Sequence, residues 1–127
     1  MSSVIKIRKG LNIKLGGMAE KIIMPEHPVS RYCIKPTDFP GLTPKLEVSE
    51  GASVQAGDTL FYDKKRPEIR FTSPVCGTVT AIIRGEKRAL LGVQVDKEGT
   101  GKINFGSADP KTLDREQVKE KILASGL

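Results

Sequence analysis

The amino-acid sequence predicts a mainly β fold, a small flattened barrel or sandwich followed by a C-terminal α-helix. Gly and Pro, at 13 and 8 of 127 residues, are frequent enough for a turn-dense β protein. Apolar segments are short and each is bounded by turn residues, as in small barrels and sandwiches. The motif E-G-x-x-V-x-x-G begins at Glu50 and S-P-V-x-G-x-V begins at Ser73. These two motifs form a weak internal repeat.

The first part of the chain predicts short strands separated by turns. The expected strands are Val4–Arg8, Leu11–Leu15, Arg31–Lys35 and Lys45–Val48. The first of them alternates apolar and basic residues, as a half-buried strand does. A connection with three prolines, PTDFPGLTP, joins the last two. We expect Cys33 to face inward as a small hydrophobic residue, and His27 to lie in an exposed loop.

The central region predicts two hairpins. The first pairs Asp58–Tyr62 with Glu68–Thr72 across a charged tip, Asp63–Pro67; the second pairs Thr78–Arg84 with Ala89–Asp96 across the loop Gly85–Arg88. The turn glycines permit positive φ angles. Val54, Leu60, Val75 and Val79 supply the apolar positions between the turns. Along the last strand, Leu91, Val93 and Val95 should share one face.

The last segment, Asp114–Ala124, predicts an α-helix. Asp114 is a good N-cap, Gln117 stands at the capping-box position, and Leu113 with Val118 can form a hydrophobic staple. Gly126 suits the position after the helix. Because so short a helix is marginal alone, its narrow apolar stripe of Val118, Ile122 and Leu123 must dock on something.

These elements predict two units. Residues 1–101 form the β domain with its N-terminal strands, and its core lies at about 29–96. Residues 102–127 form a linker plus helix, which we expect to begin a further domain truncated at residue 127.

Composition excludes several functions. The net charge is +6, but Lys and Arg are dispersed and only two Tyr, four Phe and no Trp could stack on bases, so nucleic-acid binding is not expected. No apolar run is long enough to span a membrane, and the N-terminus lacks the apolar region of a secretory signal. Neither a catalytic constellation nor a metal-ligand spacing emerges. We therefore expect no catalytic, metal or cofactor site in these residues.

Two basic clusters are the candidate functional residues. Lys64, Lys65 and Arg66 belong to the first tip, and Arg84, Lys87 and Arg88 surround the second loop. Exposed charges contribute little to stability, so both clusters are candidates for docking a partner. For the first cluster a solvated turn is the favoured interpretation and docking is the alternative. For the second, docking or solvation is favoured over phosphate binding. A hairpin loop lacks the helix N-terminus that phosphate sites commonly use.

The central repeat resembles the half-barrel of biotinyl and lipoyl carrier domains, a barrel-sandwich hybrid whose prosthetic lysine lies on such a tip. Asp63-Lys64 matches the Asp-Lys pair of a lipoyl tip. Ser73 follows nine positions after Lys64, which is longer than the lipoyl pattern and implies a longer tip of different shape. Modification of Lys64 or Lys65 is therefore the weaker alternative.

Several motifs in order resemble one family more specifically. They are KGL, EGASVQAGDTLFYDKK, FTSPVCGTV and IIRGEKRAL. Together they resemble the N-terminal region of the A subunit of the bacterial Na+-translocating NADH:quinone reductase, from Ile5 to about Leu127. In that family the sequence continues after S-G-L, which implies that the chain is an N-terminal piece. The N-terminus of the C subunit of Rnf-type electron-transport complexes is related and is a second alternative; its Cys-rich iron–sulfur motifs are not found here.

The resemblance implies a place in a respiratory complex that couples NADH oxidation and quinone reduction to Na+ export. It implies a peripheral position on the cytoplasmic side of the bacterial inner membrane and contact with other subunits, especially the membrane-embedded B subunit. NADH, flavins, an iron–sulfur centre, quinone and Na+ would be used by other subunits or regions. The full-length subunit is associated with quinone in that family. For these residues the expectation is a non-catalytic structural or docking domain; a carrier domain or a quinone-binding barrel are the alternatives.

Overall fold

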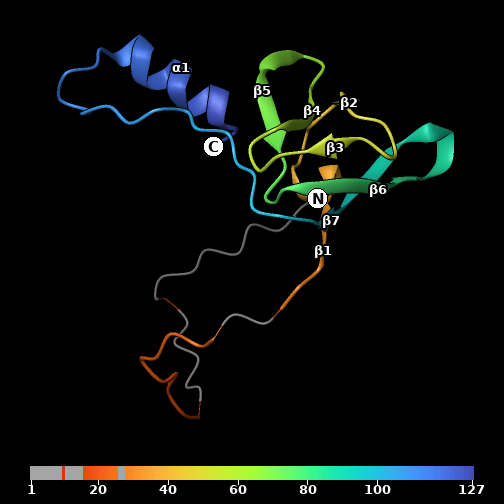
Figure 1. The fold of residues 1–127 in the computed structure, drawn as a ribbon, viewed down its shortest axis with the longest axis horizontal. Coiled ribbons are helices and arrows are strands. Elements are labelled where there is room, and N and C mark those ends of the chain that lie inside the picture. Colours follow the sequence, from red (N-terminus) through yellow and green to blue (C-terminus); the bar gives the residue numbers. More distant parts are fainter. Residues whose placement is uncertain (1–9, 11–15, 26–27) are drawn as a thin grey trace, which may run out of the picture.

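A computed structural model describes residue 10, residues 16–25 and residues 28–127, and Figure 1 shows its ribbon. The predicted strands Val4–Arg8 and Leu11–Leu15, and His27, lie outside the described residues. Two antiparallel sheets and a C-terminal helix make up the described fold. The predicted mainly β class is confirmed, and within the described residues the sheets do not close into one barrel.

Each sheet combines strands that are distant in sequence. The four-stranded sheet contains, in spatial order, β1 (Arg31–Ile34), β7 (Leu90–Lys97), β6 (Gly77–Arg84) and β3 (Ser53–Val54). The three-stranded sheet contains β2 (Pro44–Leu46), β4 (Thr59–Asp63) and β5 (Arg66–Thr72). Two short 3-10 turns, η1 (Pro36–Asp38) and η2 (Glu86–Arg88), connect strands. The predicted hairpins are therefore β4–β5 and β6–β7.

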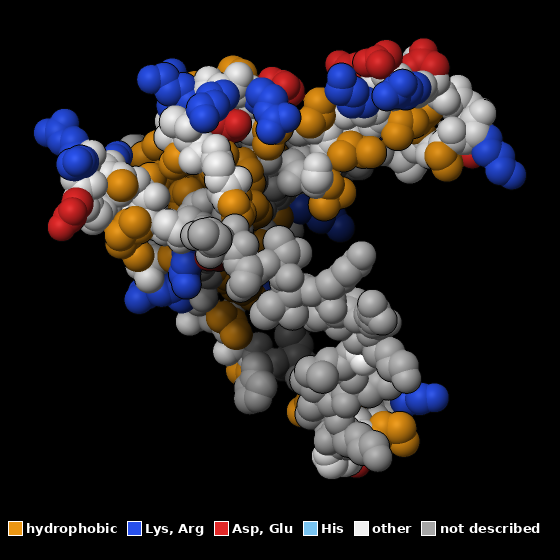
Figure 2. All heavy atoms as spheres, turned by 180° about the vertical axis from the view of Figure 1, so that it is seen from behind, with side chains coloured by type: hydrophobic (Ala, Val, Ile, Leu, Met, Phe, Trp, Pro, Cys, Tyr) orange, Lys and Arg blue, Asp and Glu red, His pale blue; other side chains and the backbone are white. Residues whose placement is uncertain are grey.

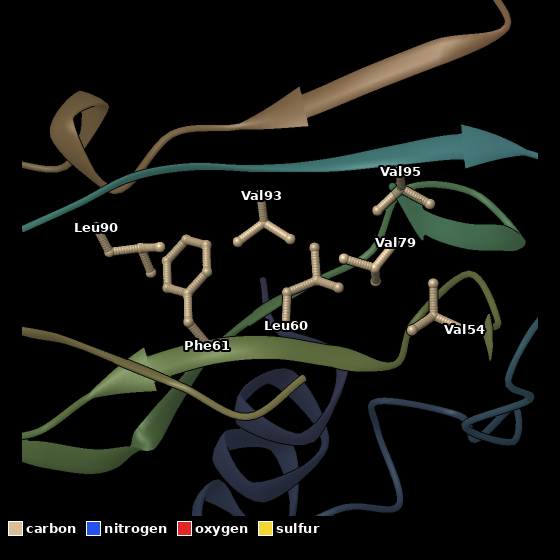
Figure 3. Close-up of a cluster of buried hydrophobic side chains, with 7 residues drawn as sticks. All are labelled: Val54, Leu60, Phe61, Val79, Leu90, Val93 and Val95. Carbon is tan, nitrogen blue, oxygen red and sulfur yellow. The ribbon is translucent and has the colours of Figure 1, made fainter. Parts of the chain in front are cut away.

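The core lies between the two sheets, as Figure 3 shows. It consists of Val54, Leu60, Phe61, Val79, Leu90, Val93 and Val95, all of them buried. Of the four apolar positions predicted from the repeat, Val54, Leu60 and Val79 are buried and Val75 packs against the core. Phe71 extends the core, because its ring stacks on Phe61 with 4.9 Å between the centroids.

A β-bulge changes the predicted face of β7. Ile83 pairs with Gly92 and Arg84 pairs with Leu90, so Leu91 is an extra residue without a partner in this ladder. A bulge of this kind breaks the strict alternation of side chains. Leu90 therefore enters the core, whereas Leu91 is exposed. The prediction that Leu91 shares a face with Val93 and Val95 is wrong for this reason.

Cys33 does not face inward, and that prediction is also wrong. In edge strand β1 its neighbours Tyr32 and Ile34 pair with Val95 and Val93 of the core strand. Because side chains alternate along a strand, Cys33 projects to the opposite face and is exposed.

One ion pair fixes the edge strand β1. The Arg31 guanidinium donates to both carboxylate oxygens of Asp96, at 2.6 and 2.9 Å. Hydrogen bonding to Arg31 lowers the pKa of Asp96 below its ordinary value. Both residues are at the surface, so the pair specifies the register more than it adds stability.

Helix α1 (Arg115–Ser125) begins as predicted. Asp114 Oδ1 accepts from the Gln117 N–H at 2.8 Å, and Gln117 Oε1 accepts from the Asp114 N–H at 3.1 Å, which completes the capping box. Gly126 ends the helix with φ of 77°, a left-handed value that favours glycine.

The C-terminal half of α1 forms hydrogen bonds with the rest of the described fold. The Thr72 hydroxyl of β5 donates to the Ser125 carbonyl at 3.4 Å, and the Lys121 ammonium donates to the Phe105 carbonyl at 3.1 Å. Ile122 remains 46% exposed. Figure 2 shows apolar side chains on the side of α1 that faces the hollow between helix and sheets. The predicted apolar stripe is therefore only partly covered within the described structure.

Candidate docking site

The β6–β7 hairpin ends in a basic tip whose backbone is left-handed. Lys87 has φ of 52° and Arg88 has φ of 62°. The Ala89 N–H donates to the Glu86 carbonyl at 3.1 Å, which closes a turn around these two residues, and the Gly85 N–H donates to the Ala89 carbonyl at 2.8 Å. Two central residues with positive φ define a type I′ hairpin turn.

This turn carries residues that its geometry does not favour. Type I′ turns prefer Asn-Gly, because a Cβ atom in the left-handed region costs about 1 kcal/mol or more per residue. Lys87 and Arg88 are instead long cationic residues, and both are exposed. Strain retained at surface residues is an indication of function. The indicated function is the presentation of positive charge.

Replacing this turn by its favoured sequence tests the strain directly. The double substitution Lys87→Asn with Arg88→Gly is expected to raise the free energy of unfolding by about 1 kcal/mol, because both residues then tolerate positive φ. Urea denaturation followed by circular dichroism measures the change. An unchanged or lowered stability would show that the native turn is not strained.

Three cations gather at this tip without an acidic partner among the described residues. The Arg84 Nη1 donates to the Arg88 carbonyl at 3.3 Å, which holds the Arg84 side chain over the turn. The ion pairs found among the described residues are Arg31–Asp96 and Glu116–Lys119, so none involves the tip. The positive charge of Arg84, Lys87 and Arg88 is therefore not neutralised by ion pairing within the described chain.

An apolar groove of about 490 Å³ borders the basic tip. It is lined from two segments, residues 36–46 and residues 84–91. The first contributes Phe39 and Leu42, and the second contributes Leu91 together with Arg84 and Arg88. The lining is thus apolar with two cationic groups at one side.

The sequence interpretation missed this groove because it treated PTDFPGLTP as a connection only. A signal was present. Phe39 and Leu42 are large apolar residues in a proline-rich loop, where exposed polar residues are the norm. The ring of Phe39 packs against Phe71 with 4.5 Å between the centroids, and this contact anchors the loop on the core.

The β4–β5 tip is a tight turn and differs from the predicted long tip. Only Lys64 and Lys65 form the turn, and Asp63 pairs with Arg66 across it. The extra length is taken up in β5 by an irregularity, since the next pair joins Tyr62 with Arg70. The prediction of a tip over Asp63–Pro67 is therefore wrong.

Asp63 serves the structure of this turn. Its side chain is 5% exposed and its Oδ1 accepts from the Lys65 N–H at 3.1 Å and the Thr43 N–H at 3.3 Å. A carboxylate that satisfies two backbone donors explains a buried Asp without catalysis. Lys64 and Lys65 remain exposed, and neither the modification hypothesis nor the docking hypothesis for them is tested by this geometry.

The six predicted cations do not form one patch. The two basic tips belong to different sheets and point apart in Figure 1. Figure 2 shows Lys and Arg side chains in separate groups on the sheets, whereas acidic side chains gather along the outer side of α1. Strand β2 connects the groove to the β4–β5 tip, because Pro44 lines the groove and pairs with Asp63 beside that tip.

Two features are absent from the described part of the chain. No helix there is long and apolar enough to cross a membrane. No group of three or more His, Cys, Asp or Glu side chains in it could hold a metal ion. Cys33 and Cys76 are free thiols.

Two antiparallel sheets that enclose one core, each with one hairpin, are the architecture of a barrel-sandwich hybrid domain. The family model described as the NqrA N-terminal barrel-sandwich hybrid domain matches residues 5–98. The chain belongs to this family.

Relatives support the same assignment. They are A subunits of the Na(+)-translocating NADH-quinone reductase, and the chain is 40% identical to that of Haemophilus influenzae (strain PittEE), 39% to that of Pasteurella multocida and 38% to that of Neisseria meningitidis serogroup A. Each comparison covers 98% of this chain and 28% of the relative. The chain thus spans 28% of the length of these relatives, and the resemblance to the A subunit of the reductase is confirmed.

Proposed function

We propose that this chain is a non-catalytic docking domain of a Na+-translocating NADH:quinone reductase, and that it holds the A subunit in place on its neighbours. The family and the relatives' names support the membership in this subunit. The observation that carries the docking role is the basic β6–β7 tip. Lys87 and Arg88 combine a left-handed backbone with exposed charge that no ion pair of the described chain neutralises.

The membrane-embedded B subunit is the proposed partner, at the cytoplasmic side of the bacterial inner membrane. A basic tip selects and orients a partner surface that carries acidic groups. Electrostatic complementarity between subunits raises association rates and suppresses wrong contacts. In this proposal Arg84, Lys87 and Arg88 meet acidic groups of the partner.

In this proposal the redox chemistry takes place in other subunits or regions of the complex. NADH, flavins, an iron–sulfur centre, quinone and Na+ would bind there. Asp63, a buried carboxylate of the described residues, is occupied by two backbone donors. The role left for these residues is to position the subunit.

The assembly experiment uses the full-length protein that carries this sequence, expressed with the other reductase subunits and purified through a tag on the B subunit. Reversal of the tip charges by Arg84→Glu, Lys87→Glu and Arg88→Glu is expected to lower the recovered ratio of the A subunit to the B subunit about fivefold or more, because each partner carboxylate then meets a like charge. Quantitative mass spectrometry of the purified complex measures this ratio.

The control removes the same charge from another surface. Lys102→Glu, Lys111→Glu and Arg115→Glu reverse three exposed cations before and at the start of α1 and should leave the ratio within about twofold of the unchanged protein. Equal ratios in all three proteins would contradict docking through the tip. NADH oxidation by the isolated chain would contradict the non-catalytic assignment.

A further inference from the structure

The groove of about 490 Å³ beside the basic tip combines apolar side chains with two arginines. We propose that it binds an extended acidic segment of a partner protein, in which one or two apolar side chains lie next to carboxylates. This inference rests on the proposed docking function and adds the chemistry of the partner segment and the place where it binds.

The apolar part of the groove is built by specific features of the backbone. The bulge in β7 turns the Leu91 side chain away from the core, and Leu91 is 38% exposed. Gly85 makes room for it, since a Cβ atom at position 85 would lie 2.9 Å from Leu91 Cδ1. On the facing segment Phe39 is 43% exposed. An apolar side chain placed between Phe39 and Leu91 would remove apolar surface of both from water.

The charged part of the groove selects an anionic partner. Arg84 at the end of β6 and Arg88 in the turn line it, and no Asp or Glu among the described residues does. Lys87 precedes Arg88 in the turn, which also contains the exposed Glu86 outside the lining. Guanidinium groups bind carboxylates through two parallel hydrogen bonds. Carboxylates next to an apolar residue therefore match a groove whose cationic groups lie at one side of its apolar lining.

The wall formed by residues 36–46 indicates how the segment binds. It contains Pro36, Pro40 and Pro44, which have no N–H group to donate. Addition of a strand depends on main-chain donors along an edge, so contact through side chains is favoured over strand addition here. Small ligands are usually enclosed over most of their surface, whereas Phe39 and Leu91 leave this groove open to solvent.

A selection experiment tests the proposal. Phage-displayed random peptides of about twelve residues are selected on the 127-residue chain, and the most enriched peptide is synthesised with a fluorescein label as the probe. We expect enriched sequences that combine Asp or Glu with Phe, Leu, Ile or Trp. Fluorescence polarisation then gives the dissociation constant of the probe for the chain and its variants.

The variants separate charge, apolar contact and non-specific attraction. Arg84→Glu with Arg88→Glu should weaken probe binding about tenfold or more, and Leu91→Asn about fivefold, because the former reverses the carboxylate contacts and the latter removes an apolar contact. All three residues are exposed, and thermal unfolding verifies that the variants fold. Lys111→Glu with Arg115→Glu makes the same charge change elsewhere and should alter binding by less than about twofold.

Absence of acidic–apolar enrichment overturns the proposal, as does equal weakening by the two double variants. Unchanged binding to Leu91→Asn also overturns it, since the groove would then contribute nothing. If the assembly experiment above succeeds while this one fails, the docking function stands and the groove assignment falls. If assembly is unaffected by tip reversal but the probe binds as expected, the proposed partner is wrong and the groove chemistry stands.

Discussion

Phe61→Ala is expected to lower the free energy of unfolding by about 4 kcal/mol, because truncation of a buried Phe loses transfer free energy and leaves a cavity. Phe61 is completely buried, and Figure 3 shows its ring between Leu90 and Leu60 in the core. Its ring stacks on Phe71, which in turn contacts Phe39. Neighbouring strands on both sheets hold the walls of this space, so little collapse can refill it. Urea denaturation of the purified chain measures the loss.

Phe105→Ala is the matched control for this prediction. Phe105 is 37% exposed and lies beyond the two sheets in the segment before α1. The same side-chain deletion there should cost about 1 kcal/mol, since solvent already reaches the ring. Similar losses for Phe61→Ala and Phe105→Ala would contradict the assignment of the core to the space between the sheets.

Gly77→Ala is expected to cost about 3 kcal/mol, which is at the upper end of overpacking effects. Gly77 is buried between two strands, opposite Val54 of β3 and Lys97 of β7. A Cβ atom at position 77 would lie 1.8 Å from the Asp96 carbonyl oxygen and 2.9 Å from the Glu98 nitrogen. Both are backbone atoms at the end of the paired strand, so relief requires β6 and β7 to separate.

The control for Gly77→Ala is Gly16→Ala. A Cβ atom at Gly16 would meet nothing within 4 Å, and this residue is exposed. Exposed substitutions of this kind change stability by about 0.5 kcal/mol or less. Comparison of the two thermal midpoints measures the difference. A Gly77→Ala protein as stable as the Gly16→Ala protein would contradict the close approach of β6 and β7.

Local sequence patterns were sufficient wherever neighbouring residues decide the structure. The capping box at Asp114 and Gln117 involves residues three positions apart, and the structure contains both of its hydrogen bonds. Hairpins β4–β5 and β6–β7 join adjacent strands, so turn residues and apolar alternation predicted them. The apolar positions of the repeat likewise followed from short-range periodicity.

The predictions were wrong where pairing between strands determines the face on which a side chain lies or the length of a turn. One extra residue in β7 reversed the expected face of Leu91. The sequence of β7 alone does not indicate at which residue the pairing with β6 becomes irregular. Cys33 projects away from the core because its neighbour Ile34 packs against the core from the other face of β1. The extra residues between Lys64 and Ser73 do not lengthen the tip, because they lie in β5 where its pairing with β4 is irregular.

The candidate site shows the same division. The sequence by itself identified Arg84, Lys87 and Arg88 as a basic cluster, and it determined the fold class and the family through ordered motifs. Only the tertiary structure decided that this cluster borders an apolar groove, because residues 36–46 and 84–91 meet through sheet packing. The left-handed backbone of Lys87 and Arg88 likewise became visible only there. Register and packing depend on contacts between distant segments, and these contacts exist only once the chain has folded.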